Sequence, residues 1–241
     1  MPPTPTTAQR REHYDAFVTA VLNLCATNSI RSDLASGRGR PVEECGPRMQ
    51  PYLVARISHY GARRAHYTVA SLIAMQRHLA HEERPYTPES AFPAPTHRTA
   101  QANPVPAAEG DGPDDTAQTA QPLDPGHAPA AGPATGEKTA VRPWRARPNL
   151  GTSLALAVAR HGFKQHRMDD RLKTLTRLSS PLLHPRLWTL AAHLDRHGAA
   201  RLDFAVLLDD LAWWDHDRLH TADRWRESYF QTLDRLVSQE H

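Results

Sequence analysis

The chain of 241 residues has few cysteines, few lysines and no long hydrophobic segment. Its two cysteines, Cys25 and Cys45, are too few for a disulfide framework or a zinc ribbon. No apolar run approaches the roughly 18 residues that cross a bilayer, and the first residues lack the apolar core of a signal peptide. We therefore expect a cytoplasmic protein with no membrane partner.

The common catalytic signatures are missing as well. The sequence has no G-x-S-x-G elbow, no phosphate-binding loop with its Gly-Lys-Ser/Thr, and no dinucleotide fingerprint. Cys25 continues an apolar stripe, which is typical of a core residue rather than a nucleophile. We therefore predict a protein that is not an enzyme and has no catalytic residues and no cofactor.

Histidine is abundant, with 15 residues, and it leaves one catalytic alternative open. His193 and His197 are one helical turn apart, as are His216 and His220, and a pair at i, i+4 can chelate a metal. Nearby acidic residues could complete such a site: Asp209, Asp210, Asp215 and Asp217. The alternative function is therefore an all-helical, metal-dependent phosphohydrolase. Because no H-E-x-x-H pattern is present, we predict no metal ligands.

A proline-rich segment divides the chain. Residues 85–148 contain 13 of the 21 prolines, and their only Ile, Leu, Val or Phe residues are Phe92, Val105, Leu123 and Val141. So little apolar surface cannot offset the entropy of ordering the segment. We therefore predict a long Pro/Ala-rich disordered linker over residues 85–148.

The two remaining pieces show apolar residues at helical spacing and no alternation typical of strands. The first stripe is Tyr14, Phe17, Val18, Val21, Leu22 and Cys25. In the second piece, one helix carries Phe204, Leu207, Leu208, Leu211 and Trp214 on its inner face, and a last helix follows it. We predict an all-α protein of two small helical bundles, residues 1–84 and residues 149–241, joined by the linker.

Aromatic residues gather between Leu211 and Phe230. Trp214, Trp225 and Tyr229 continue aliphatic stripes, so we expect them in the core. Trp213 and Phe230 lie beside these stripes, where they could pack at an edge or against a partner. The segment does not show the exposed aromatics among basic residues that a base-stacking platform needs.

Arginine supplies 26 of the 29 basic residues, and its planar fork of donors suits phosphate. The segment "RSDLASGRGRP" places Arg31, Arg38 and Arg40 around Gly37 and Gly39, which allow a tight turn and close approach to a ligand. Arg63 and Arg64 form a second basic cluster in the first piece, and further arginines are scattered along the C-terminal helices. On spacing alone, a solvated face with salt bridges is the default explanation for these later arginines.

Several segments together resemble the CasB family, the small subunit of the type I-E CRISPR surveillance complex, Cascade. In the second piece these are "NLGTSLALAVARHG", the Asp-Arg-Leu at 170–172, "LDFAVLLDDLAWW" and "DRWRESYF". In the first piece they are "IRSDLASGRGRPVEECGPRMQPYL" and "HYTVASLIAM". Their order and spacing along the chain, rather than any one of them, carry the resemblance.

The resemblance implies a non-catalytic, two-bundle helical subunit of an antiviral complex, present there as a homodimer arranged head to tail. It implies contact with guide RNA, with both the target and displaced strands of target DNA, and with other Cascade subunits. The residues that match the family's nucleic-acid-binding positions are Arg31, Arg38, Arg40, Arg64, Arg171, Arg177, Arg186, Arg218 and Arg224. Pro185 departs from the family pattern before Arg186, so we expect that helix to begin late.

Overall fold

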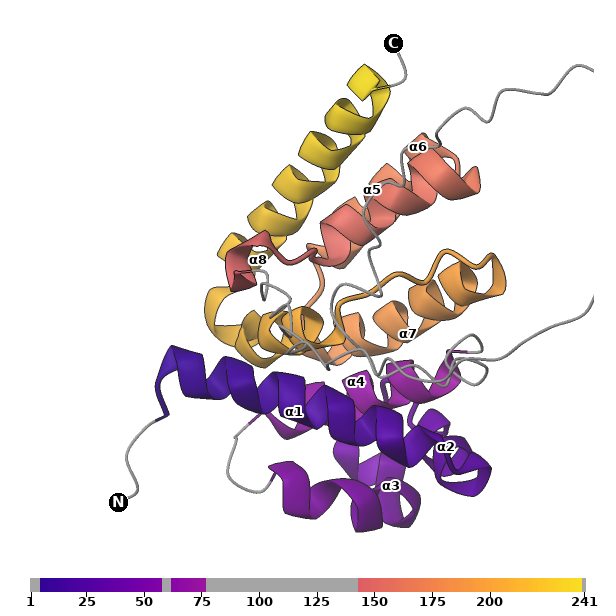
Figure 1. Cartoon of the computed structure of the whole chain (residues 1–241), viewed down its shortest axis with the longest axis vertical. Coiled ribbons are helices and arrows are strands. Elements are labelled where there is room, and N and C mark those ends of the chain that lie inside the picture. The colour runs from indigo at the N-terminus through magenta and orange to yellow at the C-terminus, as the bar shows by residue number, and fades with distance from the viewer. Residues whose placement is uncertain (1–4, 58–61, 77–142, 240–241) are drawn as a thin grey trace, which may run out of the picture. The chain divides into compact units, whose positions relative to one another are not determined.

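The computed structural model describes residues 5–57, 62–76 and 143–239, and every regular element among them is helical (Figure 1). The helices are α1 (Thr7–Cys25), α2 (Asn28–Ala35), α3 (Val42–Ile57), α4 (Arg63–Met75), the 3-10 turn η2 (Trp144–Ala146), α5 (Leu150–His161), α6 (Gln165–Leu175), α7 (Ser180–Arg196) and α8 (Phe204–Gln239). The predicted all-α fold is confirmed. Most of the predicted linker, residues 85–142, lies outside the described residues.

Local sequence explains the first helix. Thr6 and Gln9 form a reciprocal capping box at the start of α1, in which each side chain accepts the other residue's backbone N–H. The predicted apolar stripe then faces inward, and its buried members are Tyr14, Phe17, Val18 and Val21. Capping and periodicity are both short-range signals, so this helix is readable from sequence.

Helix α4 is the central element of the described fold. Every residue from Ala65 to Ala74 is buried, and the helix packs against α1, α2 and α3 as well as against α7 and α8. One buried apolar cluster extends from α1 to α8. The described helices before and after the predicted linker therefore share a core.

Helix α5 packs along α8 at very short range (Figure 1). A Cβ atom on Gly151 would lie 1.8 Å from the backbone carbonyl oxygen of Trp225, so only glycine permits this approach. Asn149 caps α5 by accepting the backbone N–H of Thr152. The same side chain donates to Ser228 Oγ on α8 at 2.8 Å, which ties the start of α5 to its neighbour.

The buried tryptophans confirm the predicted role of the aromatic segment. Trp214 and Trp225 are fully buried and stack with ring centroids 4.9 Å apart. Helix α8 bends between them at Asp217, whose φ of −141° and ψ of 48° are not helical, so its two halves correspond to the two helices expected there. Trp213 and Phe230 remain exposed.

The last residues of the predicted linker lie among the described residues. Residues 143–148 are placed, and Arg147 among them is buried with only 7 % of its surface exposed. Its guanidinium lies 2.7 Å from Asp203 and 2.8 Å from Asp15. Pairing with carboxylates from α1 and from the residue before α8 therefore anchors a segment whose apolar content suggested disorder.

Candidate nucleic-acid interface

The segment between α2 and α3, which we call the arginine turn (residues 36–41), is seated on α4 and α7. The backbone N–H of Arg38 donates to Ser71 Oγ of α4 at 2.9 Å. Arg38 and Gly39 have φ of 51° and 70°, the left-handed region that favours glycine. A Cβ atom on Gly39 would lie 2.4 Å from the carbonyl oxygen of His184 in α7. The glycine thus allows the turn to touch the helix backbone.

The two arginines of the turn point outward at this position. Both Arg38 and Arg40 are exposed. The Arg38 guanidinium lies 5.6 Å from the ring centroid of Trp188 on α7, within the range of a cation–π contact. Arg40 donates to the Ser36 carbonyl at 2.8 Å, which leaves further N–H donors on its guanidinium.

Arg64 is also bound to α7, through a backbone carbonyl that a proline leaves without its helical hydrogen bond. Helix α7 begins at Ser180 and includes Pro185, so the expected late start is wrong. Pro185 lacks the N–H that would bond to the carbonyl four residues earlier. That carbonyl, on Pro181, instead accepts a hydrogen bond from Arg64 Nη2 at 3.0 Å. Arg64 thus supplies a donor to the carbonyl that Pro185 leaves without its helical partner.

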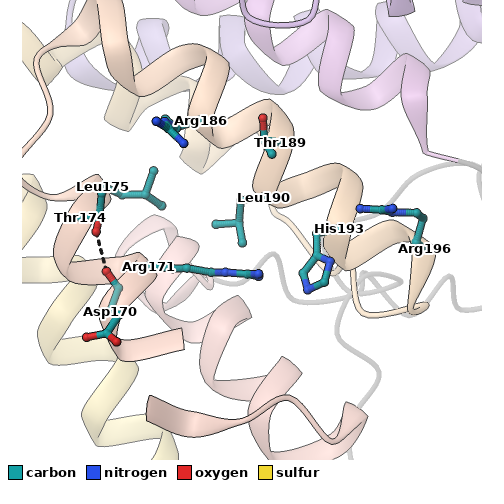
Figure 2. A pocket seen from close by; sticks show the side chains of 9 residues that line it. All are labelled: Asp170, Arg171, Thr174, Leu175, Arg186, Thr189, Leu190, His193 and Arg196. Atoms are coloured by element: carbon teal, nitrogen blue, oxygen red, sulfur yellow. Dashed lines mark hydrogen bonds between the residues drawn. The ribbon is translucent and has the colours of Figure 1, made fainter. Parts of the chain in front are cut away.

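A second group of cations surrounds a pocket of about 460 Å³ between α6 and α7. Figure 2 shows Arg171 extending from α6 towards Leu190 and His193, with Arg186 and Arg196 on α7. Only one acidic residue, Asp170, is among the side chains that line it. Burial, with a further contribution from Arg171, lowers the pKa of His193. The pocket combines an apolar floor with guanidinium donors.

The predicted residues Arg171 and Arg186 are therefore brought together at this pocket. Sequence reasoning did not include Arg196 among the nucleic-acid-binding residues and considered His193 only as part of a metal-chelating pair, although a signal was available. Residues 186, 189, 190, 193 and 196 recur at helical spacing on one face of α7. Arg38 contacts Trp188 on the same helix, so α7 is in contact with both groups of cations.

Two predicted residues make hydrogen bonds that hold the fold together. Arg31 donates from Nε to the Ala74 carbonyl at 2.9 Å and from Nη2 to the Gln76 carbonyl at 2.7 Å, which closes the end of α4. Arg224 pairs with the buried carboxylate of Asp210. These guanidinium groups already have acceptors inside the protein, so they are not simply free surface cations.

The last two predicted residues lie elsewhere. Arg177 is exposed in the connection between α6 and α7, and Arg218 is exposed next to the bend in α8. Neither lines the pocket between α6 and α7. The nine predicted arginines therefore do not form one uniform group.

The histidine pairs considered as metal ligands have other neighbours. His193 and His197 pack edge-on against Phe163, each with ring centroids 5.3 Å apart, and His216 packs on Trp213. Within residues 5–57, 62–76 and 143–239, no three His, Cys, Asp or Glu side chains are grouped so that they could hold a metal ion. In the same ranges, no helix combines the length and apolar character required to cross a bilayer.

Comparisons with known proteins give consistent results. Two solved structures, described as "CRISPR RNA-guided surveillance complex" and "CRISPR RNA-guided surveillance complex, pre-nicking", contain chains similar to this one. In each case the TM-score is 0.63 at 24 % identity, covering 96 % of this chain and 99 % of the other, which supports the fold. No curated protein matches the chain.

The family comparison covers much of the chain. The model of the family described as "CRISPR-associated protein Cse2" matches residues 30–230. This span includes the arginine turn, α4 and nearly all of the helices that follow the linker. It also confirms the resemblance found in the sequence. The chain therefore belongs to the CRISPR-associated Cse2 (CasB) family.

Proposed function

We propose that the protein is a non-catalytic small subunit of a type I-E CRISPR surveillance complex, Cascade. In that complex it binds the backbones of guide RNA, target DNA and the displaced strand, and so stabilises the R-loop. We further propose that it acts there as a homodimer alongside the other Cascade subunits. Family membership and the surveillance complexes that contain chains of similar fold support this role.

The single observation that carries the proposal is the pocket between α6 and α7. Arg171, Arg186 and Arg196 surround it, and a single acidic residue lines it. Arginine forks donate to phosphate oxygens without reading base identity. Outside the pocket, the exposed Arg38 lies over Trp188 of the same helix, and the exposed Arg40 is in the same turn as Arg38.

Such contacts can act on an R-loop because its formation is nearly balanced in free energy. The RNA–DNA hybrid is about as stable as the DNA duplex that it replaces, so modest contacts to backbone shift the equilibrium. Each phosphate that an arginine neutralises also releases condensed counterions. The resulting stabilisation is independent of target sequence and weakens as salt concentration rises.

The experiment is to replace Arg171 and Arg186 by alanine in the assembled complex and to measure R-loop lifetime at several salt concentrations. We expect shorter lifetimes by the same factor for unrelated targets. The salt slope for binding should also fall by about 0.7–0.9 per lost contact. The control is Arg48→Ala with Arg201→Ala, since both residues are exposed and line neither this pocket nor the cavity described below. Unchanged lifetime and slope in the Arg171/Arg186 variant would contradict the proposal.

A further inference from the structure

A second basic cavity, of about 550 Å³, lies where η2 and the start of α5 meet α1 and the second half of α8. We call it the η2 cavity. Five arginines line it: Arg11, Arg145, Arg147, Arg224 and Arg235. It shares no lining residue with the pocket between α6 and α7, and the sequence prediction included only Arg224 among its arginines.

The carboxylates that balance part of this charge do not line the cavity. Arg147 is paired with Asp203 and Asp15, and Arg224 is paired with Asp210. By contrast, Arg145 and Arg235 are exposed and make no ion pair with any described residue. No Asp or Glu lines the cavity, so a ligand there meets cationic and neutral groups.

Buried donors around the cavity lack acceptors. Arg11 Nε, Arg224 Nε and Trp144 Nε1 are all inaccessible to solvent and have no hydrogen-bond partner among the described residues. Leaving a buried donor unpaired costs about 1–3 kcal/mol. Arg11 Nε is 3.9 Å from Asp209, which is too far for a hydrogen bond. All three residues line the cavity, so the hydrogen-bonding capacity of its lining is only partly met by the described residues.

Guanidinium groups also hold the aromatic side chain at this site. The Arg147 guanidinium lies 4.4 Å from the Trp144 ring centroid, and that of Arg11 lies 5.2 Å from it. Both distances are within cation–π range. Because Arg147 is itself fixed by two carboxylates, the tryptophan and the neighbouring Arg145 are held at the cavity by a buried ion-pair network.

We infer that the η2 cavity binds phosphate groups of a single polynucleotide strand, a second backbone contact that rests on the proposed function. Phosphodiester oxygens accept hydrogen bonds and carry negative charge, which matches a lining with five arginines and no acids. The arginines come from α1, from η2 and the residue that follows it, and from α8, so the cations are spread over the cavity rather than gathered at one point. An acidic peptide would bring backbone N–H donors too, and the lining offers no carboxylate to accept them.

The test uses the full chain and a labelled oligothymidylate of about 20 nucleotides, whose binding is followed by fluorescence anisotropy over a series of salt concentrations. Arg145 and Arg235 are replaced together by alanine, because both are exposed and have no ion pair to lose. We expect roughly tenfold weaker binding near 0.1 M salt and a salt slope smaller by about 1.4. Arg48→Ala with Arg201→Ala is the matched control and keeps the wild-type affinity. Thermal unfolding of both variants checks that each is folded.

Other outcomes separate this inference from the proposed function. Wild-type affinity and slope in the Arg145/Arg235 variant overturn the inference, and the proposed function survives if Arg171→Ala with Arg186→Ala still weakens binding. If both double variants bind like the wild type, the inference and the proposed function fail together. Binding of labelled polyglutamate is measured in parallel. If the Arg145/Arg235 variant loses polyglutamate binding but keeps oligothymidylate binding, the occupant is an acidic protein segment and the inference is overturned.

Discussion

Gly39 and His184 touch through their backbones: a Cβ atom on the glycine would lie 2.4 Å from the histidine carbonyl oxygen. This contact joins two segments separated by the predicted linker and brings the arginine turn onto the helix that carries Arg186 and Arg196. The position of Arg38 and Arg40 therefore depends on one residue without a side chain.

Replacing Gly39 by alanine should displace the turn and destabilise the protein. The left-handed backbone costs about 1–2 kcal/mol for a residue with a Cβ atom, and the clash with His184 adds about 1–3 kcal/mol. Gly162 has a similar φ of 68°, but a Cβ atom there would meet nothing within 4 Å. Chemical denaturation of Gly39→Ala and Gly162→Ala measures the difference. Equal losses in the two variants would show that the close approach contributes nothing.

Removing Arg147 should cost about 3–5 kcal/mol, because it leaves the carboxylate of Asp203 buried without a counter-ion. The Asp203 side chain is inaccessible to solvent and also accepts the Val206 backbone N–H at the start of α8. Arg226→Ala is the control, since its ion pair with Asp223 is largely exposed, and such pairs contribute about 0–1 kcal/mol. Urea denaturation compares the two variants. Similar small losses would argue against a structural role for residues 143–148.

Replacing Arg31 should mainly lower the stability of the fold, whereas replacing Arg38 should mainly weaken oligonucleotide binding. Arg31→Ala removes two hydrogen bonds to the end of α4 and should lower the free energy of unfolding by about 1–3 kcal/mol. Arg38→Ala loses an exposed cation and should change stability by less than about 1 kcal/mol, while weakening oligonucleotide binding. Denaturation and anisotropy on both variants measure this. A large loss of stability in Arg38→Ala would contradict the assignment.

The role of Arg64 can be tested through Pro185. In the native chain, Arg64→Ala leaves the Pro181 carbonyl without the hydrogen bond that it now accepts, at a cost of about 1 kcal/mol. With Pro185→Ala present, the backbone N–H of residue 185 can bond to that carbonyl. Arg64→Ala should then cost less. A double-mutant cycle measures this coupling, and strictly additive losses would contradict it.

Acid should destabilise the fold through two buried histidines. Burial lowers the pKa of His184 to about 3, helped by Arg64, and burial lowers the pKa of His66 to about 4. In the unfolded chain both pKa values return to about 6.5, so below that pH the unfolded state binds more protons. Each histidine then lowers the free energy of unfolding by up to about 1.4 kcal/mol per pH unit as pH falls from 6.5 towards 4.

The measurement is the free energy of unfolding at several pH values between 7 and about 4.5. His184→Gln should reduce the slope, because it removes one of the two buried groups that take up protons on unfolding. A stability that stays constant over this range would show that these histidines titrate alike in the folded and unfolded chain.

The helices and their inner faces could be predicted because their signals are local. The stripe from Tyr14 to Val21 and the burial of Trp214 and Trp225 follow from spacing of three and four residues. The family resemblance likewise depends on the order of short segments. Arg171 and Arg186 could be proposed together because both match that family pattern, although the pocket that they share was not visible.

The partners of Arg31 and Arg147 were decided only when distant segments packed together. Arg31 finds its acceptors 43 and 45 residues later in the chain, and Arg147 finds carboxylates 132 residues before and 56 residues after it. Helical periodicity relates residues only three or four positions apart. It therefore predicts which face of a helix a side chain occupies, but not which residues of other segments pack against that face. The positive charge of these arginines was therefore evident from the sequence. Whether their N–H donors are free to bind a ligand depends on the tertiary structure, because acceptors from distant segments already bind some of those donors.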